Sequence, residues 1–151
     1  MDGGALFYCL PWSRASTHER ICQLYVDYVT RRYGHATILF DGYDDGPTTK
    51  YAAHIRRTGV CPSLKVNFAG DMIIKSKKDE FLANEVNKQR FINLLDSLDR
   101  VGCTTINARG DADVLIVTTA VESARSIDTI LVGEDTDLGV LLIFYSELGC
   151  K

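Results

Sequence analysis

The chain has 151 residues, of which 46% are hydrophobic and 25% are charged, and its net charge is −3. These values are typical of one soluble globular domain with a proper core. Five scattered cysteines without a C-x-x-C pair argue against a disulfide framework or a zinc site. No signal peptide opens the chain, and no apolar run approaches the roughly 18 residues of a membrane span. We therefore expect an intracellular protein, nuclear or cytoplasmic, with no membrane partner.

The charged residues are unevenly distributed along the chain. Residues 48–100 carry a net charge of +4, and residues 101–151 carry −5. A basic face beside an acidic pocket is compatible with nucleic-acid binding. The alternative is that the central helices simply have solvated, lysine-rich faces.

The first third of the chain predicts two strands and a helix. The apolar run Ala5–Leu10 predicts a short strand. Ser16–Glu19 has the S-x-x-E form of a capping box, which predicts a helix that ends at Gly34. The continuous apolar run Ala36–Phe40 predicts a strand that is covered on both faces.

The middle third predicts helices separated by irregular chain. Pro47 suits the first turn of a helix that runs to Thr58. Residues 61–72 are expected to be irregular, with a short strand over residues 65–68 as the alternative. One long helix is expected from Lys77 to Gly102.

The last third continues the alternation of strands and helices. Strands are predicted over Thr104–Ala108 and Thr129–Val132, with helices over residues 111–125 and 136–145. Alternating elements of this kind predict an α/β fold, with a mostly parallel central sheet between two helical layers. No linker or repeat divides the chain, so residues 1–151 are expected to form a single three-layer α/β/α domain.

Acidic residues stand just after the predicted strands. They are Asp41, Asp111, Asp113, Asp135 and Asp137. In open α/β sheets, sites form outside the carboxyl ends of the strands, so these side chains are expected at one edge. Asp2 is the exception because it precedes the predicted strand of residues 5–10. It would join the same edge if a strand ended near Gly3.

A cluster of carboxylates at one edge cannot stay fully ionised without cations. Oxygen ligands without His or Cys suit hard ions, so we expect one or two Mg²⁺ or Mn²⁺ ions. Two such ions about 4 Å apart would generate a hydroxide nucleophile and stabilise the leaving oxygen of a phosphodiester. For any single acidic residue, the alternative is that it caps the following helix.

Three motifs occur in a recognisable order. Phe40–Gly42 (F-D-G), Gly110–Ile116 (G-D-A-D-V-L-I) and Gly133–Leu142 (G-E-D-T-D-L-G-V-L-L) together resemble the PIN-like nuclease superfamily, most closely its flap-endonuclease branch. The whole chain also resembles a group of eukaryotic proteins of suspected mobile-element origin that carry this core. The resemblance implies a PIN-like fold and a metal-dependent nuclease acting on DNA or RNA.

The resemblance also implies roles for particular residues. The implied metal ligands are Asp2, Asp41, Asp111, Asp113, Asp135 and Asp137. Flap endonucleases usually have two glutamates in place of the middle pair, so the metal positions are expected to differ here. Pro47–Lys50 stands where the family has a P-x-x-K at a helix start, which implies that Lys50 and Arg57 are catalytic and bind the scissile phosphate. The alternative is an ordinary exposed basic helix.

Further basic residues lie between the F-D-G and G-D-A-D motifs, where flap endonucleases place a helical gateway over the substrate. We expect nucleic-acid contacts from Arg56, Lys75, Lys77 and Lys78. Glu85 is a further candidate metal ligand, but a solvated helix charge is the favoured interpretation.

Three functions stay open at this point. The favoured one is a nuclease that hydrolyses phosphodiester bonds with Mg²⁺ or Mn²⁺. The second is a catalytically silent PIN-like module, or a domain truncated at one or both ends, that binds nucleic acid or protein. The third is a phosphatase of the haloacid dehalogenase type, because residues 132–137 (V-G-E-D-T-D) resemble its final acidic motif. The D-x-D-x-T/V nucleophile motif of that family is missing.

Overall fold

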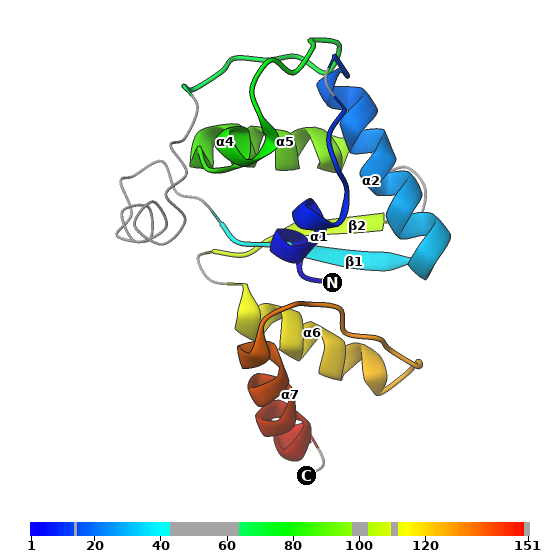
Figure 1. Ribbon diagram of the computed structural model, residues 1–151. Coiled ribbons are helices and arrows are strands. Elements are labelled where there is room, and N and C mark those ends of the chain that lie inside the picture. The colour runs from blue at the N-terminus through cyan, green and yellow to red at the C-terminus, as the bar shows by residue number, and fades with distance from the viewer. Residues whose placement is uncertain (14, 43–63, 98–102, 110–111, 150–151) are drawn as a thin grey trace.

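The computed structural model describes residues 1–13, 15–42, 64–97, 103–109 and 112–149. These residues form a mixed α/β fold with a two-stranded parallel sheet and six helices. The elements are α1 (Gly3–Cys9), α2 (His18–Tyr33), β1 (Ala36–Phe40), α4 (Lys78–Leu82), α5 (Glu85–Ser97), β2 (Cys103–Asn107), α6 (Asp113–Ala124) and α7 (Thr136–Gly149). Figure 1 shows α1, α2, α4 and α5 on one side of the sheet, with α6 and α7 on the other.

β1 is buried on both faces, as its apolar run predicts. β1 and β2 pair in parallel, with Ala36 opposite Cys103. Ile38 and Phe40 belong to the core on the α1 side, whereas Leu39 belongs to the core beside α6 and α7. Because successive side chains of a strand point to opposite faces, a strand between two helical layers needs an unbroken apolar run.

Aromatic side chains dominate the core on the α1 side. The ring of Phe7 lies 5.1 Å from that of Phe40 and 5.9 Å from those of Tyr25 and Phe91, measured between centroids. Each such pair contributes about 0.5–1.5 kcal/mol beyond the area that it buries. The Tyr25 hydroxyl also donates to the Phe7 carbonyl at 2.7 Å. Through Phe7, α1 therefore packs against both the sheet and α2.

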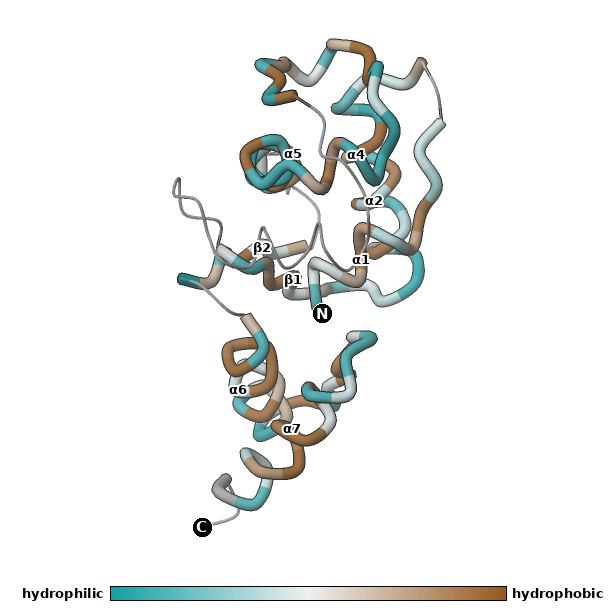
Figure 2. Tube along the Cα trace, turned by 60° about the vertical axis from the view of Figure 1, so that its left-hand side comes forward, coloured by the Kyte–Doolittle hydropathy of each residue, from teal (hydrophilic) through white to brown (hydrophobic). Residues whose placement is uncertain are grey.

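The second core is aliphatic. It joins β1 to the last two helices through Leu39, Ile116, Val117 and Leu138, each with less than 3% of its surface exposed. Figure 2 shows that apolar residues also continue around α7. No helix in the described parts of the chain is long and apolar enough to cross a membrane.

The predicted strand at Ala5–Leu10 is wrong, because these residues lie mainly in α1. A short apolar run fits a buried helix as well as a buried strand. Asp2 is the N-cap of this helix, and its Oδ1 accepts a hydrogen bond from the Gly4 amide at 2.8 Å.

The cap of α2 differs from the predicted capping box by one residue. Thr17, not Ser16, is the N-cap, and its hydroxyl accepts from the Arg20 amide at 3.2 Å. The end of the helix is confirmed at Gly34, which has a φ of 70°. A positive φ is a conformation that glycine adopts without steric cost.

The single long helix predicted from Lys77 is also wrong, because α4 and α5 are separate helices. Ala83 and Asn84 lie between them. The Oδ1 of Asn84 accepts hydrogen bonds from the amides of Val86, at 3.1 Å, and Asn87, at 3.2 Å. The asparagine thus starts a new helix in the way that an N-cap residue does.

The predicted strand at Thr129–Val132 does not form. One backbone hydrogen bond, from the Asp2 amide to the Val132 carbonyl at 2.8 Å, links this segment to the chain start. The strand predicted at Thr104–Ala108 is confirmed within one residue, and the helices predicted over residues 111–125 and 136–145 are confirmed as α6 and α7. Within residues 61–72, those from 64 onward are irregular as expected. The helix predicted over residues 47–58 lies outside the described residues.

The burial of His18 predicts that the folded protein loses stability in acid. Its ring is 3% exposed, stacks on Phe68 with 4.0 Å between centroids, and its Nδ1 lies 2.7 Å from the Met72 carbonyl. Burial lowers the pKa of His18, against a smaller raising effect of that hydrogen bond. Because the folded-state pKa lies below the ordinary value of 6.5, the free energy of unfolding should fall as the pH drops through that value.

Urea unfolding between pH 5 and pH 8 would measure this dependence. The His18→Gln variant should show a smaller loss of stability between pH 6.5 and pH 5 than the parent chain does. The exposed His35 provides the matched control, since His35→Gln should leave the loss unchanged. Equal pH profiles for the parent and His18→Gln would contradict the assignment.

Candidate functional site

The predicted acidic residues come from segments that meet at one edge of the sheet. Figure 1 shows that α6 and α7 both begin on the side where β1 and β2 end. Asp41 is the first residue after β1, Asp113 is the first residue of α6, and Asp135 and Asp137 flank the first residue of α7. Asp41 and Asp113 follow β1 and β2 as expected, whereas Asp135 and Asp137 follow a segment that is not a strand.

Asp2 lies at the same edge. The Met1 carbonyl accepts a hydrogen bond from the Leu39 amide at 2.9 Å, and Asp2 forms a parallel bridge with Leu39. On its other side, the Asp2 amide donates to Val132 at 2.8 Å. Met1 and Asp2 therefore run parallel to β1, and α1 begins directly after them. The condition for placing Asp2 here was a strand that ends near Gly3, and the extended segment ends at Asp2.

Asp41 connects β1 to α6. Its Oδ1 accepts a hydrogen bond from the Ala112 amide at 2.9 Å. A carboxylate that accepts from an amide at a helix start is favoured both by the hydrogen bond and by the helix dipole. This bond holds the start of α6, and with it Asp113, beside the end of β1.

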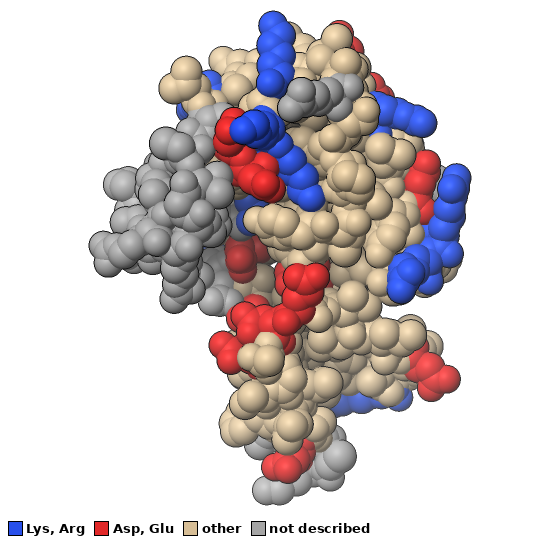
Figure 3. All heavy atoms as spheres, viewed as in Figure 1, with Lys and Arg blue, Asp and Glu red and all other residues tan. Residues whose placement is uncertain are grey.

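The turn before α7 is acidic and solvated. Asp135 and Asp137 are exposed, and the Oδ1 of Asp135 accepts from the Asp137 amide at 3.0 Å. Figure 3 shows acidic side chains gathered where the pair of α6 and α7 meets the rest of the molecule. Helix capping, the alternative role for a single acidic residue, is thus confirmed for Asp135.

Two glycines allow the close approach of these segments. A Cβ atom added at Gly133 would overlap the Leu138 side chain and would lie 3.5 Å from the Cβ of Asp2. A Cβ added at Gly3 would overlap the Phe40 ring. Only glycine provides this room, so the acidic turn and the chain start lie side by side.

Lys88 is a residue of this edge that the sequence analysis assigned no role. Lys88 is half-buried, and its ammonium group lies 5.8 Å from the centroid of the Phe7 ring. Burial lowers the pKa of Lys88, while the negative charges of Asp41, Asp2 and Glu85 act in the opposite direction.

A signal for Lys88 was present in the sequence. Lys88, Phe91, Ile92 and Leu95 follow the i, i+3, i+4, i+7 spacing of one helix face. The three apolar members of that set are buried. A lysine within the buried face of an amphipathic helix is uncommon, and it indicates that a compensating charge lies nearby.

The structure describes three of the four basic residues that were predicted to contact nucleic acid, and these three differ in their exposure and in their partners. Lys75 is exposed, and Lys77 is exposed and lies 3.6 Å from Glu80. The Nζ of Lys78 donates to the Leu10 carbonyl at 2.9 Å, and this bond holds the Lys78 ammonium at the C-terminal end of α1. Burial lowers the pKa of Lys78. Lys50, Arg56, Arg57 and Asp111 lie outside the described residues.

The donor chemistry of this edge suits a hard divalent ion. The acidic side chains that meet there offer only oxygen atoms, and two of them, Asp2 and Asp41, raise the pKa of Lys88. Within the described residues, no three His, Cys, Asp or Glu side chains are close enough together to hold a metal ion. Magnesium usually keeps several waters and uses only one or two protein carboxylates.

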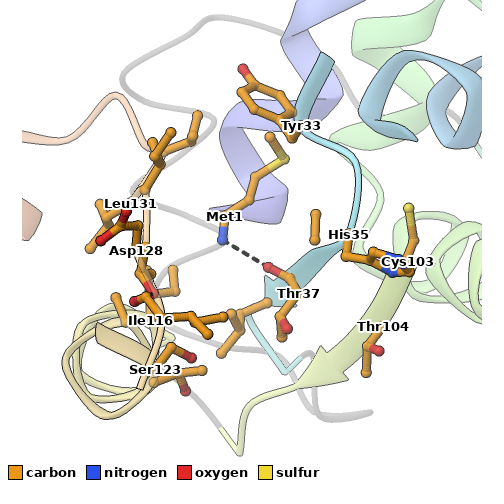
Figure 4. A pocket seen from close by; sticks show the side chains of 18 of the residues that line it. Met1, Tyr33, His35, Thr37, Cys103, Thr104, Ile116, Ser123, Asp128 and Leu131 are labelled. Atoms are coloured by element: carbon orange, nitrogen blue, oxygen red, sulfur yellow. Dashed lines mark hydrogen bonds between the residues drawn. The ribbon is translucent and has the colours of Figure 1, made fainter. Parts of the chain in front are cut away.

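A separate cavity lies at the opposite ends of the strands. It has a volume of about 650 Å³ and is lined by the beginnings of β1 and β2, by α6 and by residues 127–132. Figure 4 shows Met1 at its centre, where the terminal ammonium donates to the Thr37 carbonyl at 2.8 Å. Burial lowers the pKa of this ammonium. None of the acidic residues at the other edge, which we call the carboxylate edge (Asp2, Asp41, Asp113, Asp135 and Asp137), lines this cavity.

No protein-family model, curated protein or solved structure matches the chain. The resemblance to PIN-like nucleases therefore stays a prediction from three motifs.

Gly133→Ala should destabilise the protein by about 1–3 kcal/mol, because the new methyl group must displace Leu138. Gly139 offers a matched control within α7, since no atom lies within 4 Å of an added Cβ there. Gly139→Ala should instead stabilise the protein by about 0.5–1 kcal/mol through the higher helix propensity of alanine. Urea unfolding of both variants would measure the two effects, and the same sign for both would contradict the close packing at Gly133.

Proposed function

We propose that this protein is a metal-dependent nuclease that hydrolyses phosphodiester bonds of DNA or RNA. The observation that carries the proposal is the meeting of Asp2, Asp41, Asp113 and the acidic turn of residues 134–137 at one sheet edge. These side chains come from four separate segments, so local helix capping alone does not explain why they meet. The order of the three acidic motifs along the chain adds independent support.

The fold in this proposal is a three-layer α/β/α domain of PIN-like type. Parallel pairing of β1 and β2 supports it, as does the presence of helices on both sides of the sheet. The position of Asp2 also supports it, because this residue ends a strand-like segment beside β1. In PIN-like nucleases of the flap-endonuclease branch, an aspartate ends the first strand.

The proposed chemistry divides between the metal and the side chains. One or two Mg²⁺ or Mn²⁺ ions, when bound, supply an activated water and Lewis acidity. Asp2, Asp41 and Asp113 are the described residues nearest the sheet that would hold them. Asp135 and Asp137 are exposed and so remain accessible from solvent, where a phosphodiester would arrive. Asp111 would complete this set of ligands.

Basic side chains would bind the phosphate groups of the substrate. Lys50 and Arg57 are proposed to hold the scissile phosphate and to offset its developing negative charge. Lys75 and Lys77 are exposed and able to contact the nucleic-acid backbone, together with Arg56. Lys78 contributes charge from a fixed position, since its ammonium is bound to Leu10. Because the proposed substrate is a nucleic acid, the proposed localisation is intracellular, either nuclear or cytoplasmic.

A second candidate is a PIN-like module that binds nucleic acid or protein without cutting. The observation that favours it is that no three acidic side chains among the described residues are grouped tightly enough to hold a metal. Asp2 and Asp135 each cap a helix in the structure, so both have a structural role that does not require catalysis.

The double variant Asp135→Asn/Asp137→Asn should lose nuclease activity by about 100-fold or more, which corresponds to about 2.7 kcal/mol of transition-state stabilisation. Folding should be preserved, because the side-chain oxygen of an asparagine at position 135 can still accept from the amide of residue 137. Cleavage of labelled single-stranded, flapped and hairpin DNA and RNA would be measured with Mn²⁺, Mg²⁺ or EDTA.

The control for this assay is Asp71→Asn, which changes an exposed carboxylate in the irregular segment before α4. Its rate should equal that of the parent. Undiminished cutting by the double variant, or cutting that persists in EDTA, would disprove the metal-dependent site. A folded parent that cuts no substrate would favour the silent module.

Exposed lysines predict a salt-dependent affinity for single-stranded nucleic acid. Lys75→Ala/Lys77→Ala should reduce the slope of log K against log salt by about 1.4, because each lost phosphate contact contributes about 0.7 for single strands. Fluorescence anisotropy with a labelled oligonucleotide, in Ca²⁺ or EDTA, would measure it. Arg125→Ala, at the far end of α6, is the control. An unchanged slope in the lysine variant would remove these residues from the interface.

A further inference from the structure

Lys88 lies on the buried face of α5. Its neighbours on that face, Phe91, Ile92 and Leu95, are each no more than 2% exposed. An ammonium group that is withdrawn from water in such surroundings is unfavourable unless an opposite charge or a hydrogen-bond acceptor compensates it. A cation at this position therefore requires nearby groups that stabilise it.

The aromatic core determines where the ammonium lies. Its Nζ is 5.8 Å from the Phe7 centroid, and the Phe7 ring packs 5.1 Å from that of Phe40. Phe40 directly precedes Asp41, and the helix that carries Phe7 is capped by Asp2. The cation thus lies over a ring that joins the two segments with these carboxylates.

The charges around Lys88 have the matching sign. The negative charges of Asp41, Asp2 and Glu85 raise the pKa of Lys88, against the larger lowering effect of its burial. Glu85 lies one turn earlier on the same helix, whereas Asp41 and Asp2 come from the sheet edge. Two carboxylates of the edge therefore favour a cation at the position of Lys88, beside the Phe7 ring.

We propose that Lys88 is the built-in counter-ion of the carboxylate edge, which balances Asp2 and Asp41 in the metal-free protein and weakens the binding of a divalent ion there. The metal-binding half of this inference rests on the proposed function. A divalent ion held by Asp2 or Asp41 would be repelled by the ammonium, so the lysine would set how much free Mg²⁺ or Mn²⁺ the protein needs. A lysine that only packs on Phe7 would have no such effect.

Calorimetric titration with Mn²⁺ tests the competition. Lys88→Met keeps much of the side-chain volume but removes the charge, so it should bind Mn²⁺ about tenfold or more tightly than the parent does. Lys88→Arg keeps the charge and should bind within about twofold of the parent. Lys65→Met, a change at an exposed lysine, should also leave the affinity unchanged. Equal or weaker binding by Lys88→Met would overturn the proposal.

A double-mutant cycle in EDTA tests the pairing without any metal. Lys88→Met and Asp41→Asn should each lower the melting temperature, and the double variant should lose clearly less than the sum of the two losses. Additive losses would overturn the pairing. If Lys88→Met does not fold, Lys88→Gln takes its place in both experiments.

The two experiments test different parts of the proposal, and each can contradict its part independently of the other. If neither the parent nor the Lys88 variants bind Mn²⁺, the proposed nuclease and the competition are both overturned, while the cycle still decides the pairing. If the parent binds Mn²⁺ but Lys88→Met binds no tighter, the proposed nuclease stands and the competition is overturned.

Discussion

Asp2 holds together three parts of the molecule that carry acidic residues. Its backbone amide donates to Val132, its carboxylate caps α1 through the Gly4 amide, and it bridges to Leu39 of β1. The end of β1, the start of α1 and the turn before α7 are therefore fixed at one place. The glycines that follow Asp2 and Val132 have no Cβ, and without that freedom the segments would collide with Phe40 and Leu138. The position of the carboxylate edge depends on this junction.

Gathering acidic groups at one edge costs free energy, and the structure reduces that cost in several ways. Asp41 and Asp135 each accept a hydrogen bond from an amide at the start of a helix. Such bonds stabilise the charged form of a carboxylate. Asp135 and Asp137 also stay in contact with water. Lys88 adds a positive charge from α5, on the side of the sheet where α1 lies, and this charge is compatible with both a metal-binding and a silent site.

Several parts of the fold could be predicted from the sequence because the signals are local. The unbroken apolar run of β1 indicates burial on both faces, and Gly34 marks the end of α2 through its positive φ. The acidic residues after the predicted strands were expected at one edge, and the described ones lie there. Periodicity and turn chemistry involve residues within a few positions of one another, so the sequence alone carries this information.

Other features depend on contacts between distant residues. A strand at residues 129–132 requires a neighbouring backbone, and the structure provides one hydrogen bond from Asp2. The break between α4 and α5, by contrast, involves a local contact, because the Asn84 side chain accepts from the amides of Val86 and Asn87 and starts α5. The sequence by itself determined which segments are buried and which residues carry charge at strand ends. Only the tertiary structure decided that Phe7 of α1 packs against Phe40 and that Lys88 lies over the Phe7 ring, because both contacts join residues that are distant in the chain.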